Sequence, residues 1–475
     1  FMDTPSENVT FNEWDIAKQW GVKTNREISS NPLFSPRAGF RWNIDREKGM
    51  LLRGGVGIFT GRIPFVWLSN SFSNTGVEFM KYYYSYPSFS GFHIATDPYG
   101  QLNMLQNAKT DNTTEVDVFS KDFKFSQNLR FNLAYEMRLP FDVKMTLEGM
   151  YSKTLNDILY RNINIEESGE TVASKGYAPF DQRAYFKKIN GDYTRVMLLD
   201  NTSKGYTYNL SAKLEKSFDF GLDAMVAYTY GQSKSLNSGG SSVAWSNFRY
   251  NYTVGHPNEP ELGYSNFNIP HRVVGMLTYN KKWNNNLRTS VSLIYTGQSG
   301  TPYNVYYYGD LNGDGSDSND LLFIPTDAQI DQMKFVSTDK LTADQQRADL
   351  KAWLGNAAYL KDHRGEVYKR NADNAPWENH FDFRFMQEFS LKVGKEYHSL
   401  QLSFDILNVG NLLNREWGLE TTTAYYAPIS YGNLTNADGV KEYGFQYTSG
   451  ANNKPLKSSD LYSRWRAQIG VRYSF

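Results

Sequence analysis

Short segments in which apolar and polar side chains alternate recur along this chain. The last is Trp465–Phe475, whose odd-numbered residues are apolar and whose intervening residues are polar or glycine. Strict alternation predicts a β-strand with one apolar and one polar face. About ten residues is also the length that a tilted strand needs to cross a bilayer, whereas strands of soluble proteins usually have about five or six. The pattern therefore predicts a membrane-spanning strand.

The same alternation occurs in five pairs of segments, each pair joined by a short turn. The pairs are Arg37–Ile44 with Leu52–Ile58, Phe131–Leu139 with Val143–Tyr151, Tyr208–Leu214 with Leu222–Tyr230, Val273–Tyr279 with Leu287–Tyr295, and Phe381–Leu391 with Leu400–Ile406. Long polar stretches separate the pairs. Short turns at one end and long loops at the other are typical of transmembrane barrels, whereas compact soluble domains have mostly short connections. We therefore expect an all-β, transmembrane, antiparallel up-and-down β-barrel with long extracellular loops.

Five hairpins and a final strand make eleven strands, the first and the last running in the same direction. Because bacterial barrels have an even number of strands, we expect residues 1–475 to be the C-terminal part of a single outer-membrane β-barrel domain. An even total of about 22 would match a plugged outer-membrane transporter. The longest loop should contain one short helix, because the capping box Thr342–Gln345 precedes apolar Leu350, Trp353 and Leu354 at helical spacing.

Composition agrees with this fold and excludes several functions. The 475 residues contain no Cys and carry 50 basic and 50 acidic side chains, which argues against disulfides, thiol catalysis and nucleic-acid binding. Aromatic residues make up 16% of the chain, while the mean hydropathy is −0.58. A barrel explains both values, because half of each strand faces water and aromatic girdles mark the membrane interfaces. A soluble, aromatic-rich β protein would have a similar composition.

The sequence from Gly309 to Leu321 opens like a calcium-binding loop, with the pattern D-x-N-x-D-G. The candidate ligands for a structural Ca²⁺ are Asp310, Asn312, Asp314, Ser316, Asp317 and Asp320. The twelfth position is Leu321, where an EF-hand has a bidentate Glu, so Asp317 or Asp320 would have to replace it. The alternative is a turn in which Asp and Asn side chains bind the loop's own backbone.

Other candidate sites are less specific. Tyr303, Tyr306, Tyr307 and Tyr308 are candidates for stacking against a peptide or sugar, or for packing within a loop or membrane girdle. The apolar stretch Gly61–Asn70 predicts either a loop folded inward or a contact with a partner. The six His residues show no metal-binding spacing and the strand carboxylates would line a lumen, so we expect no enzymatic activity.

Several stretches resemble the TonB-dependent outer-membrane receptors, specifically the Oar-like group of Bacteroidetes. They are Leu33–Phe40, Arg53–Asn70, Asn268–Arg272, Gly309–Leu321, His363–Gly365, Ala375–Asn379 and Phe404–Asn414. The resemblance implies an N-terminal carboxypeptidase-regulatory-like domain, a plug with a TonB box and a 22-stranded barrel. Because Phe1–Asp3 does not begin a signal peptide, we expect that domain, the plug and the early strands to lie outside the 475 residues.

The chain's end resembles the C-terminal targeting signal of outer-membrane barrels, which implies recognition by the barrel-assembly machinery. The residues that carry this likeness are Trp465, Ile469, Val471, Tyr473 and Phe475. The family resemblance implies that the protein lies among the lipids of the outer membrane of a diderm bacterium. Its loops would be extracellular and its C-terminus periplasmic.

The resemblance also implies a receptor that binds a large ligand through its loops and passes it through a plug-gated barrel. The plug would connect it to the inner-membrane TonB complex. A peptide or an oligosaccharide suits the size of the loops. An iron chelate fits less well, because the sequence contains no metal-capturing cluster. The alternative is an outer-membrane anchor, or a subunit of an envelope complex with another envelope protein, that displays large loops for adhesion or assembly.

Overall fold

The computed structural model describes residues 15–24, 32–62, 64–75, 96–97, 99–100, 115–176, 178–394, 396–422, 426–447 and 457–475. Its main feature is a 14-stranded sheet in which eleven long strands follow one another as an antiparallel meander. These strands are β1 (Arg37–Asp45), β2 (Met50–Thr60), β4 (Gln127–Leu139), β5 (Val143–Asn162), β9 (Gly205–Ser217), β10 (Leu222–Ser235), β12 (His271–Lys282), β13 (Leu287–Gln298), β17 (Glu378–Val393), β18 (Glu396–Leu407) and β23 (Arg466–Ser474). The predicted five hairpins and final strand are therefore confirmed.

Shorter strands lie beside the meander or in its loops. They are β3 (Glu115–Phe119), β6 (Ile165–Thr171), β7 (Ala184–Lys188), β8 (Arg195–Thr202), β11 (Gly263–Tyr264), β14 (Pro302–Tyr303), β15 (Val305–Tyr308), β16 (Asp373–Asn374), β19 (Thr421–Thr422), β20 (Tyr426–Thr435), β21 (Lys441–Tyr447) and β22 (Lys457–Ser458). Strand β8 joins β5 to β3, and β15, β20 and β21 form a separate three-stranded sheet.

The described helices are all short. They are α1 (Asp15–Trp20), α2 (Phe65–Ser73), α4 (Ala244–Arg249), α5 (Asp327–Gln332), α6 (Ala343–Asn356), α7 (Ala358–Asp362), α8 (Val409–Leu413) and α9 (Asp460–Ser463), with 3-10 turns at Pro140–Asp142 and Ala173–Lys175. Within the described part of the chain, no helix has the length and apolar character needed to cross a membrane.

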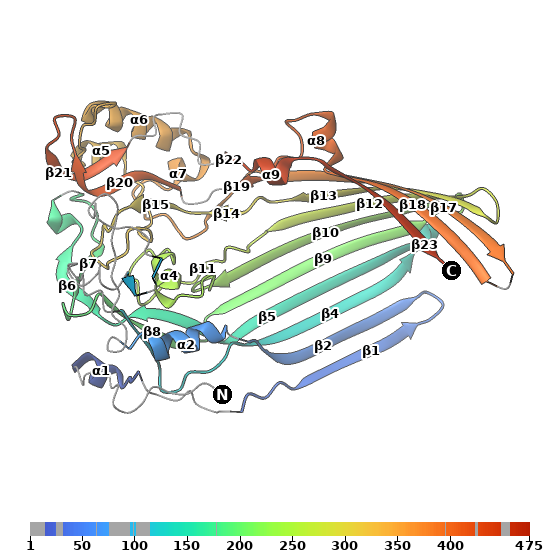
Figure 1. The fold of residues 1–475 in the computed structure, drawn as a ribbon, viewed down its shortest axis with the longest axis horizontal. Helices are drawn as coiled ribbons and strands as arrows, with labels where there is room; N and C mark the ends of the chain where they lie inside the picture. Colours follow the sequence, from blue (N-terminus) through green and yellow to red (C-terminus); the bar gives the residue numbers. More distant parts are fainter. Residues whose placement is uncertain are drawn as a thin grey trace.

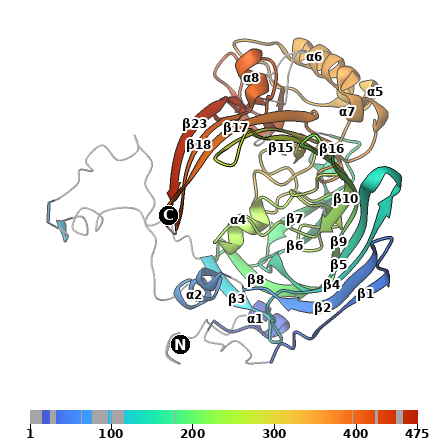
Figure 2. The same ribbon diagram turned by 90° about the vertical axis from the view of Figure 1, so that its right-hand side faces the viewer.

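The meander has two different ends, which we call the turn end and the loop end. The short turns, such as Pro140–Asp142, lie at the turn end together with the C-terminus, whereas α4 to α7 and the short strands gather at the loop end (Figure 1). Viewed along the strands, the sheet forms an open arc with α4 on its concave side (Figure 2). This asymmetry agrees with the pattern of short turns and long loops predicted from the sequence.

Strands β1 and β23 are the two outer strands of the meander and have the same direction, because eleven antiparallel strands alternate. Among the described residues, β1 is hydrogen-bonded along its length to β2 and β23 to β18. A direct pair between β1 and β23 would be parallel. Closure by antiparallel pairs alone therefore requires an odd number of further strands between them.

Cross-strand register places the apolar residues of the meander on one common face. Phe40 lies opposite Gly54, Gly54 opposite Leu133, Leu133 opposite Gly149, and Gly149 opposite Leu210. Large and small side chains thus alternate along this row. The large members are exposed in the described structure, which is the arrangement of a lipid-facing surface.

The opposite face is polar and lines the concave side of the arc. Side chains on the inside of a curved sheet converge, and Ala134, Thr146 and Ser290 on this face are accordingly buried. Their sequence neighbours Leu133, Leu147 and Tyr135 belong to the apolar face, with Leu133 and Leu147 exposed. The two faces of the strands are therefore separated as the alternation predicts.

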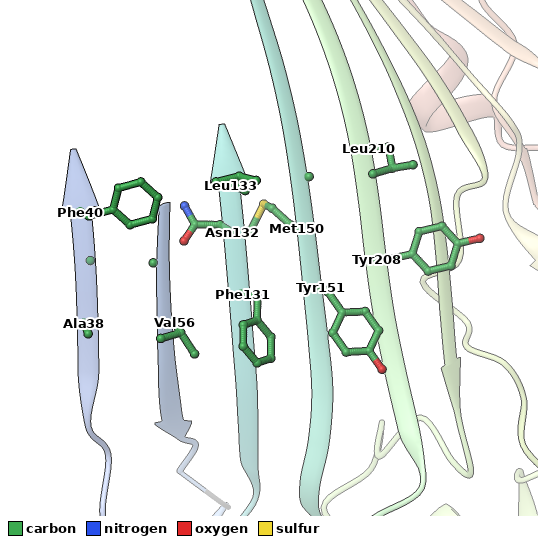
Figure 3. Close-up of a pocket in the computed structure, with 13 residues that line it drawn as sticks. Ala38, Phe40, Val56, Phe131, Asn132, Leu133, Met150, Tyr151, Tyr208 and Leu210 are labelled. Atoms are coloured by element: carbon green, nitrogen blue, oxygen red, sulfur yellow. The ribbon is translucent and has the colours of Figure 1, made fainter. Parts of the chain in front are cut away.

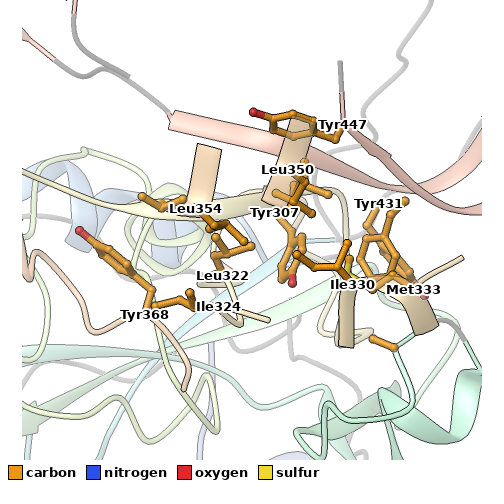
Figure 4. Packing of buried hydrophobic residues seen from close by; sticks show 14 of the residues in the cluster. Tyr307, Leu322, Ile324, Ile330, Met333, Leu350, Leu354, Tyr368, Tyr431 and Tyr447 are labelled. Carbon is orange, nitrogen blue, oxygen red and sulfur yellow. The ribbon is translucent and has the colours of Figure 1, made fainter. Parts of the chain in front are cut away.

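The long loops fold into a core of their own at the loop end (Figure 4). Helix α6 contributes Leu350, Trp353 and Leu354, which are buried as their spacing predicts. The Thr342 side chain accepts a hydrogen bond from Gln345 N, and the Gln345 side chain accepts one from Thr342 N, so the predicted capping box is confirmed. The sequence pattern predicts only this helix.

Helix α5 was missed, although the sequence contains a signal for it. Thr326 and Gln329 form a second reciprocal capping box at the start of α5, and Ile330 in this helix is buried. The T-D-A-Q sequence at Thr326–Gln329 is the same signal as the one before α6. The segment after it is too short to show an apolar stripe, and its helix packs against the loop core.

Candidate functional site

Ion pairs cross the strands on the polar face. Arg53 Nε donates to Glu136 Oε1 across 3.1 Å, and its Nη2 lies 3.4 Å from Glu148 Oε2. Lys144 Nζ lies 3.2 Å from Glu136 Oε2. On the other side of the arc, Arg384 pairs with an aspartate of β18. Acidic and basic groups are therefore interspersed at these positions of the polar face.

A polar cavity of about 320 Å³ is lined partly by α4, the helix that lies on the concave side of the arc (Figure 2). Its lining is Ser238–Ser241, Ser246, Asn247, Tyr250–Tyr252, Asn266 and Arg370. Arg370 is buried and donates to the carbonyl oxygens of Ser235 and Leu236 and to Asn251 Oδ1. Burial lowers the pKa of Arg370 to about 10, so this side chain stays charged at neutral pH and holds the cavity rim together.

A second polar cavity, of about 370 Å³, lies where the loop ends of β13 and β17 meet the segment before β23. It is lined by Thr296, Gln298, Thr301, Glu378, His380, Asp382, Leu407, Asn408, Glu420, Tyr462, Arg464 and Arg466. Glu378 is buried and its Oε2 accepts from Gln298 Nε2 across 3.2 Å. Both signs of charge lie around this cavity, so it suits a ligand that carries hydrogen-bonding groups of both kinds.

Helix α2 accounts for most of the apolar stretch Gly61–Asn70, of which Ile63 lies outside the described residues. Trp67 and Leu68 are buried in a cluster with Tyr160 and Phe248. Trp67 Nε1 donates to Ser241 O across 2.8 Å, next to the first cavity. The sequence left two alternatives for this stretch, a loop folded inward or a contact with a partner. The buried side chains of α2 correspond to the loop folded inward.

The Asp-rich loop binds much of its own backbone. Asp310 Oδ1 accepts from Gly313 N at 2.7 Å, and its Oδ2 accepts from Gly315 N at 3.0 Å. Asp314 Oδ1 accepts from Ser316 N at 2.7 Å. These bonds correspond to the Asx-rich turn that the sequence allows as an alternative. In the described part of the chain, no three His, Cys, Asp or Glu side chains are grouped so that they could hold a metal.

The remaining predicted ligands of this loop have different partners. Asp317 Oδ1 accepts from Arg249 Nε at 3.0 Å and from Ser318 Oγ at 2.6 Å. Asp320 Oδ2 accepts from Leu311 N at 2.9 Å. The Arg249 guanidinium thus engages Asp317, while Asp320 closes the base of the loop.

Burial determines the protonation of the carboxyl groups in this loop. Burial and the neighbouring charge of Asp314 raise the pKa of Asp310 to about 7. Burial likewise raises the pKa of Asp314 to about 6, and that of Asp320 well above its ordinary value. By contrast, the pKa of Asp317 is lowered by its hydrogen bonds to Ser318 and Arg249, which outweigh burial. Burial therefore disfavours the ionised form of the carboxyl groups of Asp310, Asp314 and Asp320.

The predicted tyrosine cluster is divided between the loop core and the surface. Tyr306 and Tyr307 are buried, and Tyr307 packs at 5.5 Å from the ring of Phe445. Tyr303 is half-buried and its hydroxyl donates to an aspartate of β16. Tyr308 is exposed. Tyr306 and Tyr307 therefore pack within the loops. Of the four predicted tyrosines, Tyr308 has the exposed ring that could stack against a ligand.

The residues that resemble a targeting signal lie on the apolar face of β23 or directly flank this strand. Trp465, Ile469, Val471, Tyr473 and Phe475 are exposed there. The Tyr473 hydroxyl lies 2.6 Å from His398 Nδ1 on β18. The strand is therefore paired on one side while its apolar side chains remain accessible.

A shallow groove of about 730 Å³ follows the apolar face across β1, β2, β4, β5 and β9 (Figure 3). Its lining includes Gly149 together with the larger Phe40, Phe131, Tyr151 and Leu210, and the four larger side chains are labelled in Figure 3. The row of alternating large and small side chains described above produces this shape. Because the groove lies on the apolar face of the sheet, acyl chains would fill it in a membrane.

Comparisons with solved structures find an outer-membrane transporter, a ferric enterobactin receptor and an iron transporter. The Escherichia coli outer-membrane transporter YddB is 13% identical, with a TM-score of 0.41, and the match covers 92% of this chain. A variant of the Pseudomonas aeruginosa ferric enterobactin receptor PfeA is 11% identical, with a TM-score of 0.37 and the same coverage. A variant of the Neisseria meningitidis iron transporter FrpB is 9% identical, with a TM-score of 0.25 and 78% coverage. This chain spans 40% of the length of each.

Comparison with sequence families identifies the family of the chain. No curated protein sequence matches the chain. The family described as "Outer membrane beta barrel domain" matches residues 12–441. The antiparallel meander, its separated apolar and polar faces and this match, which covers most of the sequence, lead to one conclusion: the chain belongs to the outer-membrane β-barrel domain family.

Proposed function

We propose that this chain is the barrel portion of a TonB-dependent outer-membrane receptor that binds a large ligand at its loop end and passes it through a gated lumen. One observation carries the proposal. An outer-membrane sheet with a polar concave face leads from short turns to a large loop assembly that contains two polar cavities. Dependence on TonB, and membership of the Oar-like group of Bacteroidetes, rest on the sequence stretches that resemble that family.

The proposal requires the loop end to be extracellular and the turn end, with the C-terminus, to be periplasmic. The absence of Cys from the 475 residues makes this simple to test. Asp438→Cys places a thiol in an exposed loop-end turn, and Asn285→Cys places one in an exposed turn at the other end. A membrane-impermeant maleimide should label the first in intact cells and the second only after the outer membrane is opened. The reverse pattern would refute this orientation.

In the proposed receptor, the meander is one part of a 22-stranded barrel, and the further strands lie between β1 and β23. Eleven additional strands satisfy the odd number that antiparallel closure requires. The complete receptor would include a plug, through which it engages the inner-membrane TonB complex, and an N-terminal regulatory-like domain. The exposed apolar residues of β23 would be the contact for the barrel-assembly machinery during insertion.

Transport is tested with cells that differ only in this protein. Cells with and without it are given a defined mixture of protein-digest peptides and a ladder of oligosaccharides, and depletion from the medium is followed by mass spectrometry. We expect one subset of components to be depleted only by cells that have the protein, and only while the inner-membrane proton gradient is intact. Equal depletion by both strains, or depletion after the gradient is collapsed, would exclude TonB-dependent import of these ligands.

A second function is favoured by the structure of the loops themselves. Twenty buried apolar residues form one core in the loop assembly, so the described loops resemble a folded domain displayed on the barrel. A non-enzymatic anchor or a subunit of an envelope complex would use such a domain for adhesion or assembly. Under this alternative, deleting the protein would abolish surface attachment or co-purification of a specific envelope protein, without any change in solute uptake.

A further inference from the structure

The loop from Asp310 to Asp320 buries more negative charge than its surroundings neutralise. Asp314 and Asp320 are 1% and 2% exposed, respectively. Arg183 acts on Asp320, but this guanidinium is already paired with Asp181 at 2.7 Å. Arg249 is engaged by Asp317, as described above. Buried carboxylates are normally paired with cations or bound to metals. Among the described residues, no basic side chain pairs with Asp310 or Asp314.

An uncharged oxygen in the same loop also has no partner. Asn319 is 1% exposed, and its Nδ2 donates to Asp314 Oδ2 across 2.8 Å. The Oδ1 atom of the same amide is buried and accepts no hydrogen bond from any residue that the structure describes. Because the two atoms share one amide group, only the amide carbon separates Oδ1 from the nitrogen that contacts Asp314. Exchanging the amide atoms would place oxygen against oxygen while the Asp314 carboxyl is ionised.

We propose that this loop binds one Ca²⁺ ion through Asp310, Asp314 and Asn319 Oδ1. Calcium accepts carboxylate, amide and backbone carbonyl oxygens in irregular sets. Such a set can consist of two carboxylates and one amide oxygen. It therefore does not require a group of three His, Cys, Asp or Glu side chains, which the described residues do not contain. Asn312 and Ser316 would act in support, because Asn312 Oδ1 accepts from Asp314 N and Ser316 Oγ donates to Arg249 O.

The ion would hold together several loops that are distant in sequence. The backbone oxygen of Asn312 accepts from Phe186 N across 2.7 Å, and Leu321 O accepts from Arg183 Nη1 across 2.8 Å. Asn319 O accepts from Thr253 N across 3.3 Å. The Asp-rich loop therefore connects the β6–β7 hairpin and the segment after α4 with the loop core. Neutralising its buried charge should order the rim of the first cavity.

The binding test uses Tb³⁺, which replaces Ca²⁺ at oxygen sites and is sensitised by nearby aromatic rings. Tyr185 is suitably placed, because a Cβ at Gly313 would contact its ring. The purified full-length protein in detergent is freed of metal and titrated with Tb³⁺, and the bound Tb³⁺ is then displaced with Ca²⁺ or Mg²⁺. We expect one saturable site that Ca²⁺ displaces far better than Mg²⁺. The second readout is proteolysis of the loop assembly with and without Ca²⁺.

Two substitutions in the same loop separate ion binding from folding. Asp314→Asn should weaken Ca²⁺ binding by about tenfold or more, because it removes one charged ligand. It should leave the metal-free protein at least as resistant to protease, because a buried charge is gone. Asp317→Asn removes a carboxylate that Arg249 already holds and should leave Ca²⁺ binding unchanged. An unaltered titration of Asp314→Asn, or no specific Ca²⁺ response in the natural protein, would overturn the proposal.

These results are independent of the receptor function. If the protein binds Ca²⁺ but depletes no ligand from the medium, the calcium site is supported and the transport function is refuted. If the protein transports a ligand but shows no response to Ca²⁺, the transport function is supported and the calcium site is refuted.

Discussion

Trp67 Nε1 donates a hydrogen bond to the carbonyl oxygen of Ser241 across 2.8 Å, although 174 residues separate them in the chain. The bond fastens α2 to the loop between β10 and α4, which forms one rim of the first cavity. The buried Trp67 ring also meets the Tyr160 ring edge-on, with centroids 5.8 Å apart. One side chain thus couples a segment near the N-terminus to the candidate binding region.

Replacing Trp67 should loosen this region in two distinguishable steps. Trp67→Phe loses the hydrogen bond but keeps most of the packing, at a cost of about 1 kcal/mol. Trp67→Ala also leaves a cavity and should cost about 3–5 kcal/mol of local stability. Hydrogen exchange of the backbone around Ser241 measures both. The control is Phe65→Ala in the same helix, because Phe65 is exposed; equal exchange in all three variants would contradict the assignment.

Two neighbouring residues of β9 should respond oppositely to a positive charge. Leu210 lies on the apolar face, whereas Ser211 lies on the polar face opposite Glu148. Leu210→Arg places a charge against lipid and should cost about 2–4 kcal/mol if the residue lies near the bilayer centre. Ser211→Arg should be tolerated, because it has a carboxylate beside it. The free energy of folding of each variant into lipid vesicles measures this difference. An equal loss of free energy in both variants would contradict the assignment of one face to lipid and the other to water.

Gly309 is a position where a side chain should not be accepted. Its φ is +116°, and a Cβ there would overlap the carbonyl oxygen of Tyr431. Gly309→Ala should therefore destabilise the loop assembly by several kcal/mol, through backbone strain and the overlap together. Gly439 is the matched control, since its φ is +76° but a Cβ would meet nothing within 4 Å. Gly439→Ala should cost only about 1–2 kcal/mol, and protease resistance of the loops compares the two.

Asp117 should make the loop region more stable in mild acid than at neutral pH. Burial and the nearby Glu115 raise the pKa of Asp117 to about 7, against the opposing effects of the Asn74 hydrogen bond and Arg195. The folded state then keeps a proton that the unfolded state releases near pH 4. Stability therefore falls as pH rises from about 4 to about 7, by at most about 4 kcal/mol.

Asp117→Asn should remove this fall, because the amide does not titrate and still accepts the hydrogen bond from Asn74 Nδ2. Urea unfolding followed by a probe on β8 at several pH values measures the slope. Asp122→Asn, at an exposed position, gives the background. An identical slope in the natural protein and Asp117→Asn would show that another group carries the pH dependence.

The strands of the meander could be predicted because two solvents act on them locally. Each strand has lipid on one face and water on the other, so every second residue is constrained by its own position and no distant partner is needed. Helix α6 could also be predicted from the local sequence, because Thr342 and Gln345 form their capping hydrogen bonds within one turn. The candidate calcium ligands were also recognised locally, as oxygen-bearing residues at alternate positions.

The loop assembly depended on contacts that no local pattern encodes. Tyr307 is buried because β15 pairs with β20 more than 100 residues later, and α2 faces inward because Trp67 reaches Ser241. Arg249 decides that Asp317 is engaged, and the vacant oxygen of Asn319 is visible only in the folded loop. By itself the sequence determined the strands, their faces and the short turns, since a two-residue period needs only the strand itself. Tertiary structure alone decided which loop residues are buried, paired or left open, because those outcomes depend on segments brought together by the closing of long loops.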